Sequence, residues 1–131
     1  MKRRQFFTAV AATGAAVAVG NAAFAGGETV YSGTFEGRSN HVTSGTARVI
    51  LEDGRYFVEL GDDFSLDGGP DPRVAFGKGG EYDPNGYLGA LLELTGKQRY
   101  AVPSVWDPAQ FTDIVIWCDV ASVPLGIAAL K

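Results

Sequence analysis

Residues 46–60 read TARVILEDGRYFVEL, and this stretch decides the fold class. Every second side chain is apolar on both sides of the central Asp53-Gly54 pair: Ala47, Val49 and Leu51 before it, and Tyr56, Val58 and Leu60 after it. Such alternation is typical of a strand with one buried face. An Asp-Gly pair supplies the positive φ angles that a tight hairpin turn requires. The sequence therefore predicts two antiparallel strands, at residues 46–51 and 55–60.

The rest of the chain continues in short segments divided by Gly, Pro and Asp, which also favours strands. Further strands are expected at residues 29–35, 73–76, 88–94, 98–102, 113–120 and 123–130. Loops are expected at residues 36–40, 62–72 and 77–86. Residues 88–94 are also helix-compatible by composition, but Gly89 and the short run favour a strand. The sequence predicts an all-β fold, an antiparallel β-sandwich or flattened barrel with a single domain.

One short helical turn interrupts this pattern. Asp107 is suited to cap it and Pro108 to occupy its first position. No longer stretch shows the helical period.

The N-terminal stretch has the features of a signal peptide. Met1 is followed by Lys2, Arg3 and Arg4, then by a small, apolar run over residues 6–19 and an A-x-A ending at Ala25. We expect residues 1–25 to be the signal, cleaved after Ala25, and residues 26–131 to be the domain. The apolar run is short for a membrane span of about 20 residues, so no integral span is expected after cleavage.

The route of export is suggested by Arg3-Arg4 followed by Gln5-Phe6-Phe7, which resembles a twin-arginine signal. Lys2 and Thr8 depart from the usual pattern, so a signal for export in the unfolded state is the alternative. Either route predicts an exported protein that is periplasmic or extracellular.

The charge and the cysteine content exclude one class of partner and two kinds of cysteine site. Removing Lys2, Arg3 and Arg4 leaves eight basic side chains against 15 acidic ones, a net charge of about −7. Nucleic acid is therefore not an expected partner. The single cysteine, Cys118, excludes an intramolecular disulfide and every all-cysteine metal site.

Cys118 lies in the most clearly patterned of the late strands. Strand alternation places Ile114, Ile116, Cys118 and Val120 on one face, with Asp113, Val115, Trp117 and Asp119 on the other. A thiolate at such a place is able to form a sulfenic acid or a mixed disulfide. The alternative is that Cys118 is a small, buried and inert apolar residue.

Several fragments together resemble one family, the DM13 domain. In chain order they are Gly33-Thr34-Phe35, His41-Val42-Thr43-Ser44-Gly45-Thr46-Ala47, Asp63-Phe64, Gly69-Pro70-Asp71-Pro72, then Leu94, Gly96, Gln98, Tyr100 and Pro103, and finally Val115-Ile116-Trp117-Cys118. The resemblance implies a redox or electron-transfer role centred on the lone cysteine, with a redox partner or another envelope protein as partner. It names no cofactor, and the chain shows no motif of a stand-alone enzyme.

Two further features are candidates for ligand chemistry. His41, the only histidine, is a candidate helper of Cys118 or a metal ligand, although a structural loop histidine is the simpler interpretation. The acidic loop carries Asp62, Asp63, Asp67 and Asp71, whose carboxylates are able to gather Ca²⁺ or to cap turns.

Aromatic residues offer a second kind of function. Trp106, Trp117 and Tyr100 are candidates for a surface that binds a ligand. Trp117 points away from Cys118 in its strand, and the alternative for it is that it covers a second apolar layer. The alternative hypothesis is therefore a non-enzymatic envelope module that recognises a ligand or protein through its loops, with Asp63 and Asp71, and its aromatics. An enzyme without a recognisable motif is the third.

Overall fold

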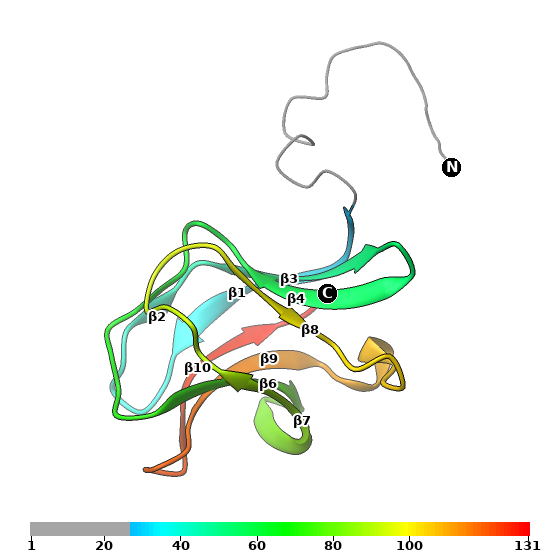
Figure 1. Cartoon of the computed structure of the whole chain (residues 1–131). Helices are drawn as coiled ribbons and strands as arrows, with labels where there is room; N and C mark the ends of the chain where they lie inside the picture. The colour runs from blue at the N-terminus through cyan, green and yellow to red at the C-terminus, as the bar shows by residue number, and fades with distance from the viewer. Residues whose placement is uncertain (1–26) are drawn as a thin grey trace.

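The computed structural model describes residues 27–131, and the predicted signal peptide lies outside the described residues. The regular secondary structure of the described residues is almost entirely β, as Figure 1 shows. Its strands are β1 (Gly27–Gly37), β2 (Thr43–Ser44), β3 (Thr46–Glu52), β4 (Arg55–Leu60), β5 (Ser65–Leu66), β6 (Pro72–Lys78), β7 (Glu81–Ala90), β8 (Gln98–Ala101), β9 (Asp113–Cys118) and β10 (Val123–Ala129).

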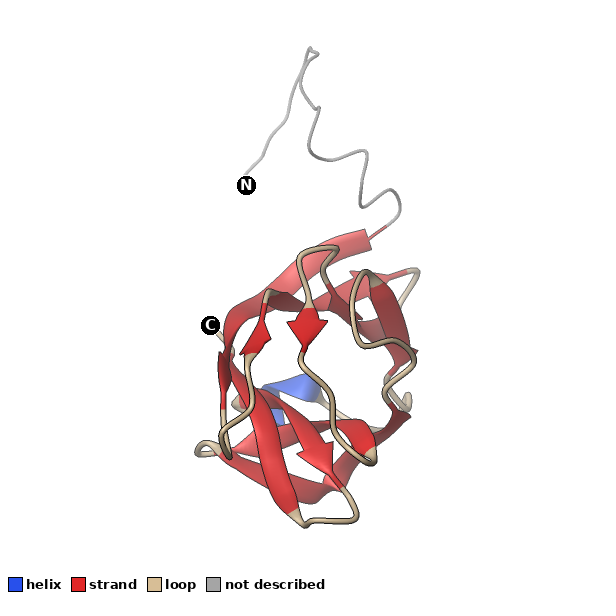
Figure 2. Cartoon of the chain, turned by 90° about the vertical axis from the view of Figure 1, so that its left-hand side faces the viewer, coloured by secondary structure: helices blue, strands red, loops and turns tan. Residues whose placement is uncertain are grey.

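Eight of these strands form one antiparallel sheet in the order β7-β6-β9-β10-β1-β3-β4-β8. The sheet curls around a common interior, as Figure 2 shows, and β2 and β5 form a separate two-stranded sheet. The long strand β1 joins the two halves, because its first part pairs with β3 and its last residues, Phe35 to Gly37, pair with β10. The predicted all-β, antiparallel, single-domain fold is confirmed, in the form of a half-barrel.

The interior of the curled sheet is the hydrophobic core. Its largest fully buried apolar side chains come from β3, β4, β6, β9, β10, the segment before β5 and the residue after β8: Val49, Val58, Leu60, Phe64, Val74, Phe76, Val102, Ile114, Ile116 and Leu125. Phe64 packs edge-to-face on Phe35, with 5.4 Å between ring centroids. Phe111 stacks on Phe76 at 4.6 Å. Aromatic pairs thus fill the space that a single curled sheet leaves inside.

The β3–β4 hairpin follows its prediction closely. Ala47 pairs with Leu60 and Val49 with Val58, so the apolar sets of both strands share the interior face. Asp53 and Gly54 have φ angles of 52° and 78°. Positive values at both central residues are those of a type I′ turn, which matches the twist of the two strands.

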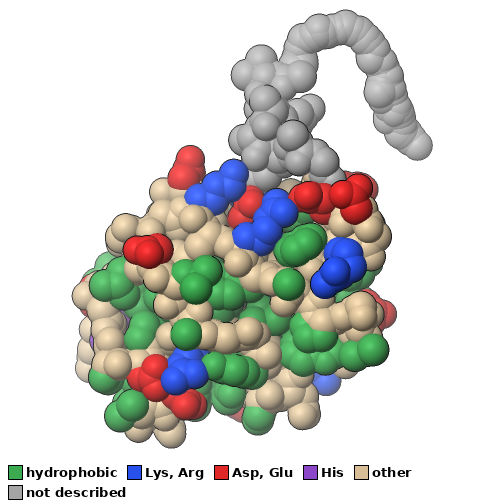
Figure 3. Space-filling model, in the orientation of Figure 1, with side chains coloured by type: hydrophobic (Ala, Val, Ile, Leu, Met, Phe, Trp, Pro, Cys, Tyr) green, Lys and Arg blue, Asp and Glu red, His purple; other side chains and the backbone are tan. Residues whose placement is uncertain are grey.

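On the outer face of this hairpin, charged side chains form a ladder across three strands. Glu59 of β4, only 2% exposed, lies between Arg48 of β3 at 3.6 Å and Arg99 of β8 at 3.4 Å. Arg99 also pairs with Glu52 at 2.9 Å. Acidic and basic side chains lie beside one another on the face seen in Figure 3, with apolar patches between them.

The prediction of a loop at residues 77–86 is wrong, because most of these residues belong to strands β6 and β7. Gly77 and Lys78 end β6, a turn at Gly79-Gly80 with φ of 61° and 81° follows, and β7 begins at Glu81. Pro84 lies within β7 because that strand is at the sheet edge and its pairing is interrupted by register shifts. A proline without an N–H is tolerated at such a place.

Two other boundaries differ from expectation. Strand β7 ends at Ala90, before the predicted end of the strand at residue 94. Beyond Ala90, backbone N–H groups donate to side chains instead of to a neighbouring strand: Leu92 N–H to Tyr100 Oη and Glu93 N–H to Gln98 Oε1. Val120, predicted on the core face, is 71% exposed, because β9 ends at Cys118 and a turn follows.

The short helical turn is confirmed as a 3₁₀ helix, Pro108–Gln110, whose cap Asp107 accepts a hydrogen bond from Ala109 N–H at 3.0 Å. Within residues 27–131, no helix is both long and apolar enough to span a membrane.

Candidate functional site

Cys118 is the last residue of β9, and its thiol lies in the core. The alternation predicted for this strand places Ile114, Ile116 and Cys118 inside, and all three have no exposed surface. Cys118 carries a free thiol. In the sheet, its position is paired with Pro72 of β6 on one side and Val123 of β10 on the other. A closed environment of this kind suppresses reaction with solutes until the chain opens locally.

Trp117 lies on the opposite face, where it forms an aromatic pair. Its indole stacks on the Tyr82 ring with 4.2 Å between centroids and 11° between planes. Burial raises the pKa of Tyr82, and the negative charge of Asp119 adds to the effect. The two rings line a surface hollow of about 230 Å³ together with Gly80, Glu81 and Pro124. Trp117 is therefore the predicted aromatic residue that borders a small surface recess.

Tyr82 was not singled out from the sequence. It lies in the stretch predicted as a polar loop, and no local pattern marks it. It meets Trp117 because β7 reaches past β6 towards β9. The close approach requires Gly77, where a Cβ atom would collide with the Glu81 carbonyl oxygen and lie 2.7 Å from Val115 Cγ2.

His41 is held by the acidic loop and not by Cys118. Its Nδ1 lies 2.8 Å from Asp67 Oδ1, and Val42 N–H donates to Asp67 Oδ2 at 2.9 Å. These bonds, first that from Val42 and then that from His41, lower the pKa of Asp67. Since an ionised carboxylate only accepts, Nδ1 is the donor in this bond, and the neutral form of the ring has its lone pair on Nε2.

The two aspartates proposed as ligand contacts are engaged in the fold. Asp63 accepts from both Thr46 N–H at 3.0 Å and Thr46 Oγ1 at 2.9 Å. Burial by itself raises the pKa of Asp63, but the bonds from Thr46 outweigh it and the pKa is lowered. Asp71 receives a two-pronged contact from Arg73, at 2.8 Å from Nε and 3.0 Å from Nη2, and this lowers its pKa.

The remaining aromatic candidates lie mainly inside. Trp106 packs edge-to-face against Phe111 at 6.0 Å and is only partly exposed. Tyr100 is buried, and burial raises its pKa while its hydroxyl donates to Gln98 Oε1 at 2.7 Å. Tyr100 belongs to the core, and Trp106 packs against it.

The predicted residues are thus distributed over several places. Cys118 lies inside, Trp117 outside, His41 before β2 and against the acidic loop, and Trp106 near the 3₁₀ helix. Among residues 27–131, no group of three or more His, Cys, Asp or Glu side chains is placed to hold a metal ion.

Comparison with known proteins identifies the family. The family described as electron transfer DM13 matches residues 34–130, from the second half of β1 to the end of β10. No curated protein and no solved structure matches the chain. The description of the family indicates an electron-transfer role. The predicted resemblance is confirmed, and the chain belongs to the DM13 family of electron-transfer domains.

Proposed function

We propose that this chain is an exported electron-transfer domain in which the Cys118 thiol is the redox group. The observation that carries the proposal is the position of Cys118 at the last residue of β9, next to an exposed turn, in a chain whose only other sulfur is Met1. A thiol at the end of a strand becomes accessible when the strand frays, without unfolding of the core.

The contacts around Cys118 support such fraying. Pro124, close to it on β10, has no N–H to donate, and the β9–β10 register shifts between Pro124 and Gly126. Ser122 in the connecting turn has a φ of 56°, a strained value for a residue other than glycine. In addition to the bonds between paired strands, Ser122 N–H donates to the Cys118 carbonyl at 2.8 Å, and this bond holds the turn against β9. Opening this end breaks that bond, the Asp119 N–H bond to the Asp71 carbonyl at 3.1 Å, and the last pairs of β9 with β6 and β10.

The chemistry that follows is a two-electron cycle. The opened Cys118 thiolate attacks one oxygen of a peroxide, the O–O bond breaks, and Cys118 becomes a sulfenic acid while hydroxide leaves. A thiol of a partner dithiol protein then displaces water to form a mixed disulfide. The partner's second thiol attacks the partner sulfur of that bond, which releases Cys118 as a thiol and leaves the partner as a disulfide.

His41 is proposed as a helper in this cycle. Its Nε2 lone pair, kept free by the Asp67 bond, is suited to take a proton from a thiol or a peroxide when that end of the molecule opens. Within residues 27–131 the structure records no hydrogen bond between His41 and Cys118, so any such role belongs to the opened state.

Thiol labelling tests the role of Cys118. The native protein is treated with peroxide and a sulfenic-acid trap, with Cys118→Ala as the matched control, and labelling is followed by mass spectrometry as a function of urea. We expect slow labelling without urea, at a rate that rises less steeply with urea than global unfolding does. Labelling that follows global unfolding only would contradict the proposal, as would full electron-transfer activity in Cys118→Ala.

A second candidate function is supported by the hollow between Tyr82 and Trp117. Stacked aromatic rings beside a recess favour recognition of a ligand or of a protein side chain, which suits the envelope-module hypothesis. If this function is correct, Trp117→Leu should abolish binding of the ligand or partner protein, whereas Cys118→Ala and Trp106→Phe should bind as the wild type does. The reverse pattern selects the redox function.

Export by the twin-arginine route is part of the proposal. It is supported by the Arg3-Arg4 pair ahead of the apolar run. Replacing both arginines by lysine should leave the protein in the cytoplasm at full length, whereas periplasmic or secreted protein beginning near Gly26 from that variant would point to the unfolded-export route.

A further inference from the structure

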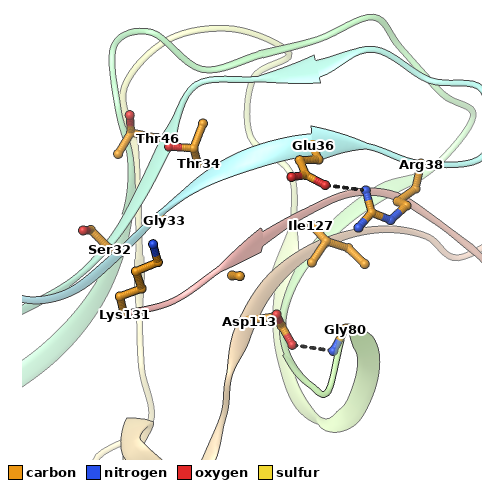
Figure 4. A pocket seen from close by; sticks show the side chains of 11 residues that line it. Ser32, Gly33, Thr34, Glu36, Arg38, Thr46, Gly80, Asp113, Ile127 and Lys131 are labelled. Carbon is orange, nitrogen blue, oxygen red and sulfur yellow. Dashed lines mark hydrogen bonds and ion pairs between the residues drawn. The ribbon is translucent and has the colours of Figure 1, made fainter.

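A polar groove lies on the outer surface of the sheet, and neither Cys118 nor His41 lines it. Figure 4 shows it between β1, β10 and the Gly80 turn. Its volume is about 560 Å³, within the range of roughly 300–1,000 Å³ that small-molecule sites occupy. Gly33, Ile127 and Ala129 provide apolar surface within it.

Small residues and one buried carboxylate build the groove. A side chain at Gly33 would collide with the Ala129 carbonyl oxygen, so glycine lets β1 and β10 approach closely there. The Gly80 turn forms a wall because Asp113 Oδ2 accepts its N–H at 2.8 Å. The same oxygen accepts the Thr112 hydroxyl at 2.7 Å, and Asp113 is only 4% exposed. The wall is thus fixed from inside the protein.

The polar lining offers donors and acceptors in balance. Arg38 and Lys131 contribute two cationic side chains, and Glu36 and Asp113 contribute two carboxylates. Ser32, Thr34 and Thr46 add hydroxyl groups, of which that of Thr46 already donates to Asp63. The Arg38–Glu36 contact is long, at 3.4 Å, and it is made by Nη1 of Arg38. Nη1 also donates to the Gly37 carbonyl, whereas Nε and Nη2 of Arg38 make no hydrogen bond among residues 27–131.

This balance indicates the class of ligand. An anion or a cation gains little from a lining whose side-chain charges cancel, whereas a hydroxyl group both donates and accepts and suits a mixed lining. The C–H groups of such a ligand are able to pack on Ile127 and Ala129. We propose that the groove binds a small, neutral, polyhydroxylated molecule, a mono- or disaccharide. No residue of the proposed redox cycle lines it.

Chemical-shift mapping on the isotope-labelled chain tests the proposal, with glucose, galactose, N-acetylglucosamine and maltose as probes. L-Alanine and lactate serve as a zwitterion and an anion. At least one sugar should give saturable shifts at the amides of Ser32, Thr34, Ile127 and Ala129. Shifts with alanine or lactate alone, or no saturable shift at these amides with any sugar, would overturn the proposal.

Variants locate the site. Thr34→Val should weaken sugar binding by about 2- to 10-fold, the value of one hydrogen bond. Thr29→Val, the same change at an exposed position of the same strand, should leave it unchanged. Ala129→Trp should fill the groove and abolish the shifts. Equal binding by the wild type and Ala129→Trp would place the sugar elsewhere and refute the assignment.

Discussion

The side chains of Trp117 and Cys118, consecutive in β9, lie on opposite faces of the sheet. The indole stacks on Tyr82 outside, and the thiol is fully buried inside. The two candidate functions of this domain are therefore separated by the thickness of one strand. Substitutions at the two positions test them independently, and each has a stability effect that must be known first.

Substitution of Cys118 should reveal how apolar its site is. Cys118→Ala should cost about 1 kcal/mol, because it leaves a small void in the core. Cys118→Ser should cost more, about 1–3 kcal/mol, because it buries a hydroxyl among apolar side chains. Urea unfolding of the three proteins checks the order. A serine variant as stable as the wild type would show that water or a polar group reaches the site.

The Tyr82–Trp117 stack should contribute a measurable coupling energy. We expect about 0.5–1.5 kcal/mol in a double-mutant cycle of Tyr82→Leu and Trp117→Leu. Urea unfolding supplies the four free energies, and Trp106→Phe is the control for effects common to the two tryptophans. A coupling near zero would mean that the rings stack without stabilising the fold.

Acid should destabilise the protein through its loop aspartates. The pKa values of Asp63, Asp67 and Asp71 are lowered from 3.8 in the folded state. Their ionised forms therefore stabilise the fold above about pH 4, and this contribution is lost as the pH falls through the lowered pKa values. The urea midpoint should fall steeply below about pH 4.

Asp63→Asn should flatten this acid dependence, since Asp63 holds Thr46 through two hydrogen bonds. Asp62→Asn is the matched control, because the neighbouring Asp62 is exposed and makes no recorded side-chain bond within residues 27–131. Equal acid slopes in the two variants would assign the effect to general charge repulsion.

Gly77→Ala should disrupt the path of β7 over the sheet. Its Cβ would collide with the backbone at Glu81 and crowd Val115. We expect a loss of about 1–3 kcal/mol and a weaker Tyr82–Trp117 contact, seen as changed tryptophan fluorescence. Gly69→Ala, whose Cβ would meet the side-chain end of Leu125 at 3.1 Å and His41 Cε1 at 3.9 Å but no backbone atom, should change both little. Similar losses in the two variants would refute the steric explanation.

The sequence by itself determined the fold class, the β3–β4 hairpin, the inward set of β9, the Asp107 cap and the family. Each of these depends on local properties: a period of two, an Asp-Gly turn, or a motif in chain order. Local pattern also placed Cys118 with Ile114 and Ile116 on the buried face.

Only the tertiary structure decided where β7 runs and what its residues meet. Pro84 and Gly86 suggest a loop when read alone, and they fit a strand only because β7 lies at the sheet edge. The Tyr82–Trp117 stack, the bonds from Thr46 to Asp63, and the groove between β1 and β10 all join residues distant in the chain. Such contacts depend on how the sheet curls, and curvature is set by packing between strands, which no short stretch of sequence encodes.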